Sequence, residues 1–271
     1  EQAAVDVGGF KALPVEPVTR RLMKQGAENY YAIIAPLILE TEIFNVGDWR
    51  ANWITRFLEE RGGLLLGLSR FRDGVDHAYT CGYALNQLRN GDVDKFLLTF
   101  YSSMAYGMDR DTYSSVEITR ITNGINELTL PHTFSNAQQL RLLRMMLVKE
   151  EGDDLLLAYA APRAWLSGNN RISVKQAPTI YGAISYSLAA DAKVNRVRAT
   201  IEPVANHSAR YPRRVRLRIH SSIGELGRVL VNGREYKQVD HDIIELDGSM
   251  LCQRVEIVAN FRPRQERSQR K

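Results

Sequence analysis

Cysteine is scarce in this sequence, with 2 residues among 271. Cys81 and Cys252 lie in different halves of the chain, and distant thiols of this kind are more often separate side chains than a disulfide. The cysteines therefore predict no disulfide framework and do not indicate a redox compartment.

Long apolar runs and the short motifs of metal and nucleotide chemistry are also missing. The run IIAPLIL contains Pro36 and falls short of the ~20 residues that a membrane-spanning helix needs. The sequence has no CxxC, HExxH, GxSxG or glycine-rich phosphate loop. We expect no membrane span, no metal and no cofactor. Because the chain begins at Glu1 without a Met and without a signal-peptide pattern, we expect a processed product or a piece of a larger protein.

The composition is that of a folded protein with a modest positive charge. Hydrophobic residues make up 44%, charged residues 25%, and the net charge is +5. The excess lies in residues 210–218 and in the tail after Phe261, without a nucleic-acid recognition motif, so no nucleic-acid partner is predicted. One basic cluster has two alternative interpretations. It is either an exposed sheet face that charge keeps soluble, or a surface that contacts an acidic polysaccharide. That cluster comprises Arg196, Arg198, Arg214, Arg216 and Arg218.

The first half of the sequence has mainly helical spacing. A first helical pattern starts near Thr19, and Asp48 precedes an apolar stripe that predicts a capped helix over residues 49–60. Residues 64–71 form a short apolar run suited to a buried connection. Residues 107–134 mix Gly, Asn, Thr and Pro, which predicts mainly loop.

A pair of helices is predicted at the centre of this half. The first covers about residues 76–88, an Asn90-Gly91 turn follows, and Asp92 is the expected N-cap of the second. Antiparallel packing would bring the polar clusters at the outer ends of the two helices together. A last helix is predicted to begin at Ser135 or Asn136.

From Asp153 onward the apolar spacing changes to a period of two, which is typical of strands. The alternation is strict over residues 214–220, and Asn232-Gly233 is a type I′ hairpin signal because both turn positions need positive φ. We therefore predict an α+β protein of two domains, helical over 1–152 and an antiparallel β-sandwich over 153–261, with a basic disordered tail over 262–271.

Three stretches carry a resemblance to a known superfamily: GDVDKFLLTFYSSMAYGMDRDTYSSVE, LLLAYAAPRAWLSGNNRISVKQAPTIYGAISYSL, and RVRLRIH with RVLVNGREY. Over most of residues 45–261 the chain resembles the C-terminal half of bacterial proteins of the six-hairpin, or (α/α)6 toroid, glycosidase superfamily. In that architecture a ring of helix pairs is followed by a β-sandwich.

The resemblance implies a partial toroid, an oligosaccharide or polysaccharide substrate, and a secreted or periplasmic location. Fewer helices precede the strands than a complete ring contains. The resemblance therefore also implies that a missing N-terminal part of the same protein, or another protomer, completes the ring. Such chains include both glycoside hydrolases and polysaccharide lyases.

Carboxylates suited to glycoside hydrolysis flank the predicted helix pair. Hydrolysis needs two carboxyl groups across the scissile bond, and Glu117 is the candidate acid, with Asp76 or Glu60 as its partner. The structural alternatives are an ion pair of Glu117 with Arg110 or Arg120, and a helix cap at Asp76. The candidate substrate-binding residues are His77, Tyr79, Arg110, Asp111 and Tyr113.

Two other functions fit the same sequence. A lyase abstracts a proton beside a uronate carboxylate, for which His77 or Tyr79 is the candidate base, with Arg70, Arg72 and Asn86 as candidates to neutralise the carboxylate. The third hypothesis is a non-catalytic binding or structural piece of a larger enzyme.

The segment LLLAYAAPRAWLSG, which joins the last predicted helix to the strands, is too apolar to be a free linker. Leu155, Leu157, Tyr159 and Trp165 need cover. We expect Trp165 to be buried where the strands dock on the helices.

Overall fold

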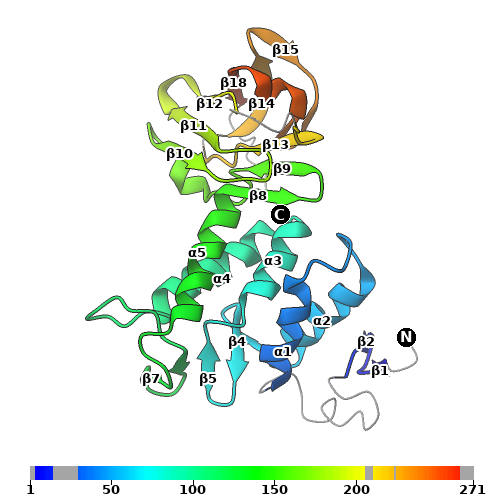
Figure 1. The fold of residues 1–271 in the computed structure, drawn as a ribbon, viewed down its shortest axis with the longest axis vertical. Helices are drawn as coiled ribbons and strands as arrows, with labels where there is room; N and C mark the ends of the chain where they lie inside the picture. The colour runs from blue at the N-terminus through cyan, green and yellow to red at the C-terminus, as the bar shows by residue number, and fades with distance from the viewer. Residues whose placement is uncertain (1–3, 15–29, 205–209, 223, 263–271) are drawn as a thin grey trace, which may run out of the picture. The chain divides into compact units, whose positions relative to one another are not determined.

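The computed structural model describes residues 4–14, 30–204, 210–222 and 224–262 of an α+β chain. The chain divides into two compact units, residues 1–143 and 144–271, whose elements are labelled in Figure 1. The start of the helical pattern predicted near Thr19 and residues 263–271 of the predicted tail lie outside the described residues.

In the described residues the first unit has four helices, and a fifth runs across the division between the units. The helices predicted over residues 49–60 and after Asp92 are confirmed. Asp48 Oδ1 accepts a hydrogen bond from the backbone N–H of Arg50 at 2.8 Å, and Asp92 Oδ1 accepts one from that of Lys95 at 3.2 Å. The helices are α1 (Tyr30–Glu40), α2 (Trp49–Glu60), α3 (Cys81–Arg89), α4 (Val93–Tyr106) and α5 (Thr133–Leu147).

The prediction of a purely helical first unit is wrong, because residues predicted as connection and loop form a five-stranded antiparallel sheet. A separate hairpin of β1 and β2 lies near the N-terminus. Each strand of the larger sheet has only two to four residues, too few to produce an alternating pattern in the sequence. The strands are β1 (Val5–Asp6), β2 (Lys11–Ala12), β3 (Leu64–Leu65), β4 (Leu68–Phe71), β5 (Gly74–Asp76), β6 (Ile118–Arg120) and β7 (Asn126–Glu127).

Two boundaries predicted for the helices need correction. The first helix of the central pair starts at Cys81 rather than near Asp76, because residues 74–76 form strand β5. The last helix starts at Thr133, before the predicted caps Ser135 and Asn136. Both corrections arise where a short strand or turn directly precedes the helix.

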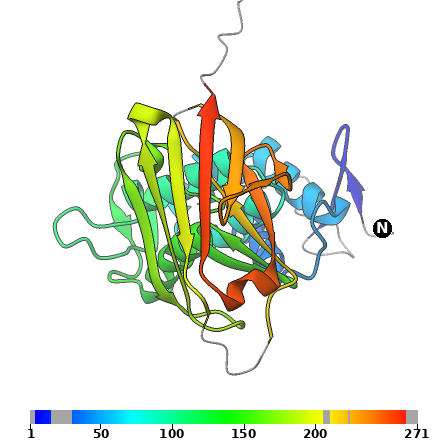
Figure 2. The same cartoon turned by 90° about the horizontal axis from the view of Figure 1, so that it is seen from above.

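In its described residues the second unit contains two sheets, three short 3-10 helices and the end of α5. A six-stranded antiparallel sheet has the order β10-β11-β12-β18-β14-β15, and Figure 2 shows β18 between β12 and β14. A five-stranded sheet has the order β16-β17-β13-β9-β8. The elements are β8 (Val148–Glu151), β9 (Asp154–Leu157), η2 (Arg163–Leu166), β10 (Arg171–Ala177), β11 (Ile184–Asp191), η3 (Ala192–Val194), β12 (Arg196–Ile201), β13 (Arg214–Arg218), β14 (Glu225–Val231), β15 (Arg234–Tyr236), β16 (Val239–Asp240), β17 (Ile243–Asp247), η4 (Gly248–Cys252) and β18 (Val255–Arg262).

The five-stranded sheet departs from the sequence prediction in two ways. Residues 148–151, predicted to belong to the helical domain, form β8 and pair with β9. Strands β9 and β13 pair in parallel, so this sheet is mixed rather than purely antiparallel. The second unit accordingly begins at Arg144, earlier than the predicted boundary after residue 152.

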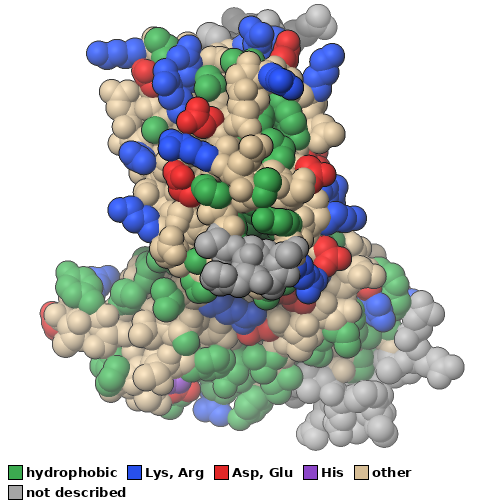
Figure 3. Space-filling view, turned by 45° about the horizontal axis from the view of Figure 1, so that its top comes forward, with side chains coloured by type: hydrophobic (Ala, Val, Ile, Leu, Met, Phe, Trp, Pro, Cys, Tyr) green, Lys and Arg blue, Asp and Glu red, His purple; other side chains and the backbone are tan. Residues whose placement is uncertain are grey.

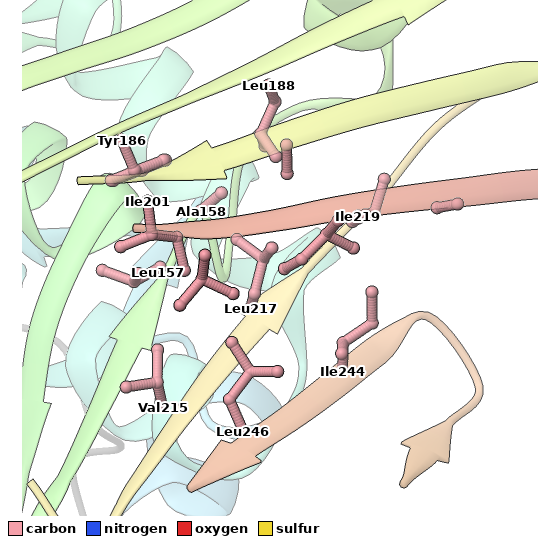
Figure 4. Packing of buried hydrophobic residues seen from close by; sticks show 14 of the residues in the cluster. Leu157, Ala158, Tyr186, Leu188, Ile201, Val215, Leu217, Ile219, Ile244 and Leu246 are labelled. Atoms are coloured by element: carbon pink, nitrogen blue, oxygen red, sulfur yellow. The ribbon is translucent and has the colours of Figure 1, made fainter. Parts of the chain in front are cut away.

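One hydrophobic cluster of the second unit draws side chains from both sheets. Figure 4 shows Leu157, Leu217 and Leu246 of the mixed sheet beside Leu188 and Ile201 of the antiparallel sheet. The predicted alternation is confirmed over residues 214–218, because the apolar positions of β13 are fully buried and the arginines between them are half-buried. It does not extend to residue 220, because β13 ends at Arg218 and both Ile219 and His220 are buried.

The Asn232-Gly233 hairpin is also confirmed, with φ of 49° and 78° and a register that pairs Val231 with Arg234.

The arginines along β13 are paired with carboxylates. Arg214 lies 2.7 Å from Asp154 and 2.9 Å from Glu245, and Arg218 lies 2.9 Å from Asp242. On the face seen in Figure 3, basic side chains are interspersed with acidic ones. These contacts favour a charge-balanced face for β13 alone. The prediction of one basic face is wrong, because Arg196 and Arg198 lie on β12 of the other sheet.

Trp165 finds cover within its own unit. Leu155, Leu157 and Tyr159 are buried as predicted, and the partly buried Trp165 packs against the hydrophobic cluster of the second unit. The expected docking of Trp165 against the helices remains a prediction.

Candidate functional site

The candidate site lies where β5 leads into α3, beside the start of β6. Asp76 pairs with Ile118 in the antiparallel register of β5 and β6, and the backbone N–H of His77 donates to the carbonyl of Glu117 at 3.1 Å. Asp76, at the end of β5, and Glu117, the residue before β6, are thus held close together by the pairing of the two strands. The sequence places them forty-one positions apart.

Asp76 is a buried carboxyl group at the end of β5. Its Oδ1 accepts hydrogen bonds from the backbone N–H groups of Ala78 at 2.8 Å and Tyr79 at 3.0 Å. Burial raises the pKa of Asp76 to about 6, these two bonds oppose the rise, and the charge of Glu117 adds to it. Because Oδ1 is already engaged by two donors, the proton of the neutral form resides on Oδ2.

Two hydrogen bonds of the Thr80 side chain hold the turn that follows Asp76. Thr80 Oγ1 donates to the carbonyl of Asp76 and accepts from the backbone N–H of Ser69, each at 2.9 Å. Asp76 therefore caps the turn before α3 rather than the helix itself, which begins at Cys81. These bonds fix the position of the carboxyl group.

Glu117 is the more accessible member of the pair, with 22% of its side chain exposed. Its Oε2 accepts from the backbone N–H of Thr129 at 3.2 Å and lies 3.9 Å from His132 Nε2. The predicted alternative of an ion pair with Arg120 is wrong, because Arg120 pairs with Asp73 and Glu127.

His132 was not among the predicted site residues. Its ring Nδ1 lies 2.7 Å from Ser135 Oγ, and its Nε2 faces Glu117. In the sequence it stands in a loop-like stretch without metal-ligand spacing, so only the fold reveals this contact. His132 is part of the PHTFS segment at the start of α5.

His77 has the surroundings of a structural residue. It is 2% exposed, and its Nε2 lies 3.0 Å from Thr119 Oγ1. Burial lowers the pKa of His77 to about 4, so the imidazole is neutral near pH 7. Asp76 and His77 are equally buried, each 2% exposed, so exposure alone does not distinguish them as proton-transfer groups. Tyr79 is half-buried, with its ring edge-to-face against Phe134 at 5.6 Å.

The remaining predicted residues lie in two other places. Glu60 ends α2 and forms an exposed ion pair with Arg56 at 2.6 Å. In the described part of the chain it contacts neither Asp76 nor Glu117. Arg110 and Asp111 line a cavity of about 350 Å³ together with Tyr106, Asn126 and other residues. Tyr113 belongs to the same turn but not to this lining, and it is 77% exposed.

The turn that carries Arg110 and Asp111 is held by Asp109. Its Oδ1 accepts from the backbone N–H groups of Asp111 at 3.1 Å and Thr112 at 2.9 Å. Thr119, which contacts His77, also lines the cavity. A polar cavity with an aromatic side chain and several carboxylate and amide groups is able to bind hydroxyl-rich ligands.

We expect Asp76→Asn to change how the free energy of unfolding depends on pH. The pKa of Asp76 is about 6 in the folded protein against 3.8 for the ordinary group, so stability falls as pH rises between these values. Asn keeps an oxygen acceptor and cannot ionise. The variant should match the parent near pH 4 and exceed it above pH 6 by up to ~3 kcal/mol. Urea unfolding at several pH values measures this.

His77 acts in the opposite direction over an overlapping range. Its pKa falls from 6.5 to about 4 on folding, so stability is lost as pH falls through that interval. Asp76→Asn should therefore be more acid-sensitive than the parent, in which the two effects partly cancel. Asp111→Asn, an exposed carboxyl, is the control and should follow the parent. A pH dependence unchanged by Asp76→Asn would contradict the burial of this group.

Comparisons with known proteins do not assign the chain to a family. No protein-family model and no curated protein matches it. No helix in the described ranges is long and apolar enough to cross a membrane. Within those same ranges, no group of three or more His, Cys, Asp or Glu side chains is placed to hold a metal ion.

Proposed function

We propose that this protein is a carbohydrate-active hydrolase that cleaves glycosidic bonds with Asp76 and Glu117. The observation that carries the proposal is a buried carboxyl group whose pKa is raised to about 6, influenced by the charge of a more accessible carboxylate. Two carboxyl groups in unequal environments are the arrangement that separates an acid from its partner in glycosidases.

In this proposal Asp76 is the proton donor and Glu117 is the carboxylate that meets water or the sugar. The Oδ2 proton of Asp76 passes to the oxygen of the departing sugar. Glu117 either takes a proton from the attacking water or attacks the sugar carbon itself, and the separation of the carboxyl groups in the substrate complex decides between these routes. The cavity beside Arg110 and Asp111 is proposed to hold a further sugar unit.

The finer fold assignment belongs to the same proposal. A partial toroid is supported by the packing of α1 against α3 and of α3 against α4. A β-sandwich is supported by the hydrophobic cluster that the two sheets of the second unit share. An oligosaccharide or polysaccharide is the substrate, and further helices from the same protein or a second protomer complete the ring.

A panel of substrates tests the proposed reaction class. We expect the protein to release reducing sugar or the aryl leaving group from at least one oligosaccharide or aryl glycoside. We expect no rise in ultraviolet absorbance with alginate, heparin or pectin, because a rise reports the unsaturated product of a lyase. A rise in ultraviolet absorbance with any uronate polymer would establish the lyase alternative instead. Inactivity in both assays would support a non-catalytic piece and contradict the proposal.

A further inference from the structure

The second unit contains a polar cavity of about 500 Å³ near the ends of β13 and β18. Its volume falls within the ~300 to 1,000 Å³ typical of small-molecule sites. Its lining includes charged and titratable groups from separate segments of residues 144–271, and none of them belongs to the site at Asp76 and Glu117. Those groups are Arg163, Arg218, His220, Glu225, His241 and Asp242.

A buried histidine orients one of the two arginines. His220 is 4% exposed, and its Nδ1 lies 3.3 Å from the carbonyl oxygen of Ala161. Because a carbonyl only accepts, Nδ1 carries the hydrogen, and Nε2 is left to accept from the Nε–H of Arg163. Burial lowers the pKa of His220, and the charges of Arg163 and Arg218 lower it further. The imidazole is therefore a neutral acceptor.

The contact with His220 fixes the Arg163 guanidinium without neutralising it. In the described ranges of the chain, no carboxylate forms an ion pair with Arg163. The residue is exposed, so its guanidinium reaches solvent at the cavity. A positioned guanidinium of this kind is suited to an oxyanion, because its planar donors match carboxylate and phosphate geometry.

The second arginine is held rigidly on another wall. Arg218 Nε lies 2.9 Å and 3.0 Å from the two oxygens of Asp242, and its guanidinium lies over the Tyr159 ring at 5.6 Å. Its side chain is 16% exposed. The ion pair engages Nε, which leaves the terminal nitrogens as donors.

The acidic groups of the cavity distinguish it from a plain anion site. Asp242 and Glu225 offset the charge of the two arginines, and carboxylates accept hydrogen bonds from hydroxyl groups. Leu226 and Phe261 add apolar surface to the lining. A ligand that matches all of these groups carries one oxyanion, several hydroxyls and an apolar ring face.

We propose that this cavity binds a sugar unit that bears a single oxyanion group, with the oxyanion at Arg163 and ring hydroxyls at Asp242 and Glu225. A uronate carboxylate and a sugar phosphate share this chemistry. The proposal concerns binding by the second unit and does not rest on hydrolysis by Asp76 and Glu117.

Isothermal titration calorimetry of the full chain at low salt tests the proposal with four probes: D-glucuronate, D-glucose 6-phosphate, D-glucose and inorganic phosphate. We expect at least one acidic sugar to bind, and glucose and inorganic phosphate to bind about tenfold more weakly or worse. The stronger of the two acidic sugars identifies the oxyanion.

Variants test whether the acidic sugar binds in this cavity or on another basic part of the surface. Arg163→Gln should weaken binding of the acidic sugar about tenfold or more. Glu225→Gln should also weaken binding, because a contact with a ring hydroxyl is lost, but the oxyanion should still bind at Arg163. Arg198→Gln, an exposed arginine on β12, is the matched control and should bind as the parent does. None of these substitutions touches Asp76 or Glu117, which keeps this result distinct from the proposed hydrolysis.

Three outcomes would overturn the proposal. They are no binding of either acidic sugar, equal binding by Arg163→Gln and the parent, and inorganic phosphate binding as tightly as the acidic sugars. The last would show a site for bare oxyanions without a sugar subsite. A thermal melt of each variant verifies that it is folded, and the four-probe comparison on the parent stands without any variant.

Discussion

Replacing Glu117 with Gln should lower kcat/KM for a glycoside substrate by a factor of about 10² to 10⁴, the usual contribution of a positioned acid or base. Gln is close in size to Glu and accepts the N–H of Thr129 through its carbonyl oxygen, so the loop that follows β7 should keep its structure. The loss therefore reports the carboxylate rather than the fold. Initial rates with the best substrate of the panel measure it.

Glu60→Gln is the matched control for this variant. Glu60 was also a candidate in the sequence, but its carboxylate pairs with Arg56 on the exposed end of α2. Its replacement should leave kcat/KM near that of the parent. Equal rates for Glu117→Gln and the parent would remove Glu117 from the chemistry, and a larger loss at Glu60 would move the site to α2.

Replacing Gly82 with Ala should destabilise the first unit by about 3 kcal/mol or more, the upper range for overpacking. A Cβ atom at this position in α3 would lie 1.8 Å from the carbonyl oxygen of Pro36 in α1 and 2.7 Å from its carbonyl carbon. Both are backbone atoms, so no side-chain rotation relieves the clash. Helix propensity alone favours Ala over Gly by ~1 kcal/mol, so packing reverses the usual sign.

Chemical unfolding followed by circular dichroism measures this effect, with Gly91→Ala as the control. Gly91 has a φ of 80° and no heavy atom within 4 Å of an added Cβ. Its replacement should cost only the ~1 to 2 kcal/mol of left-handed backbone strain. A Gly82→Ala variant as stable as the parent would contradict the close approach of α1 and α3.

Features that depend on a few neighbouring residues were predictable from the sequence. Asp48 and Asp92 cap their helices because an N-cap bond spans only two or three residues. The Asn232-Gly233 turn follows from the backbone preferences of those two residues. The alternation along β13 predicted a buried face because a strand of five residues is long enough to show it.

Features that depend on tertiary contacts were not predictable. Strands β3 to β7 are too short for a pattern, and their sheet exists because distant segments pair. The parallel pairing of β9 with β13 joins residues about sixty positions apart. His132 reaches Glu117 only because the chain folds back from β6 into α5.

The same contrast between local and tertiary features holds for the candidate site. The sequence identified Asp76 and Glu117 as carboxylates at the ends of predicted helices. The structure places Asp76 at the end of β5 and Glu117 directly before β6, which pairs with β5. It also suggested His77 as a base without indicating that its ring is buried against Thr119. Burial is set by the surrounding elements, so residue type and spacing do not reveal it.

The ionisation of Asp76, followed by carbon-13 NMR of its carboxyl group during a pH titration, tests the proposed carboxylate pair most directly. Burial and the charge of Glu117 predict a pKa of about 6 in the parent and a lower pKa in Glu117→Gln, where that charge is removed. A pKa at the ordinary value of 3.8 in the parent, or the same pKa in both proteins, would contradict the pair.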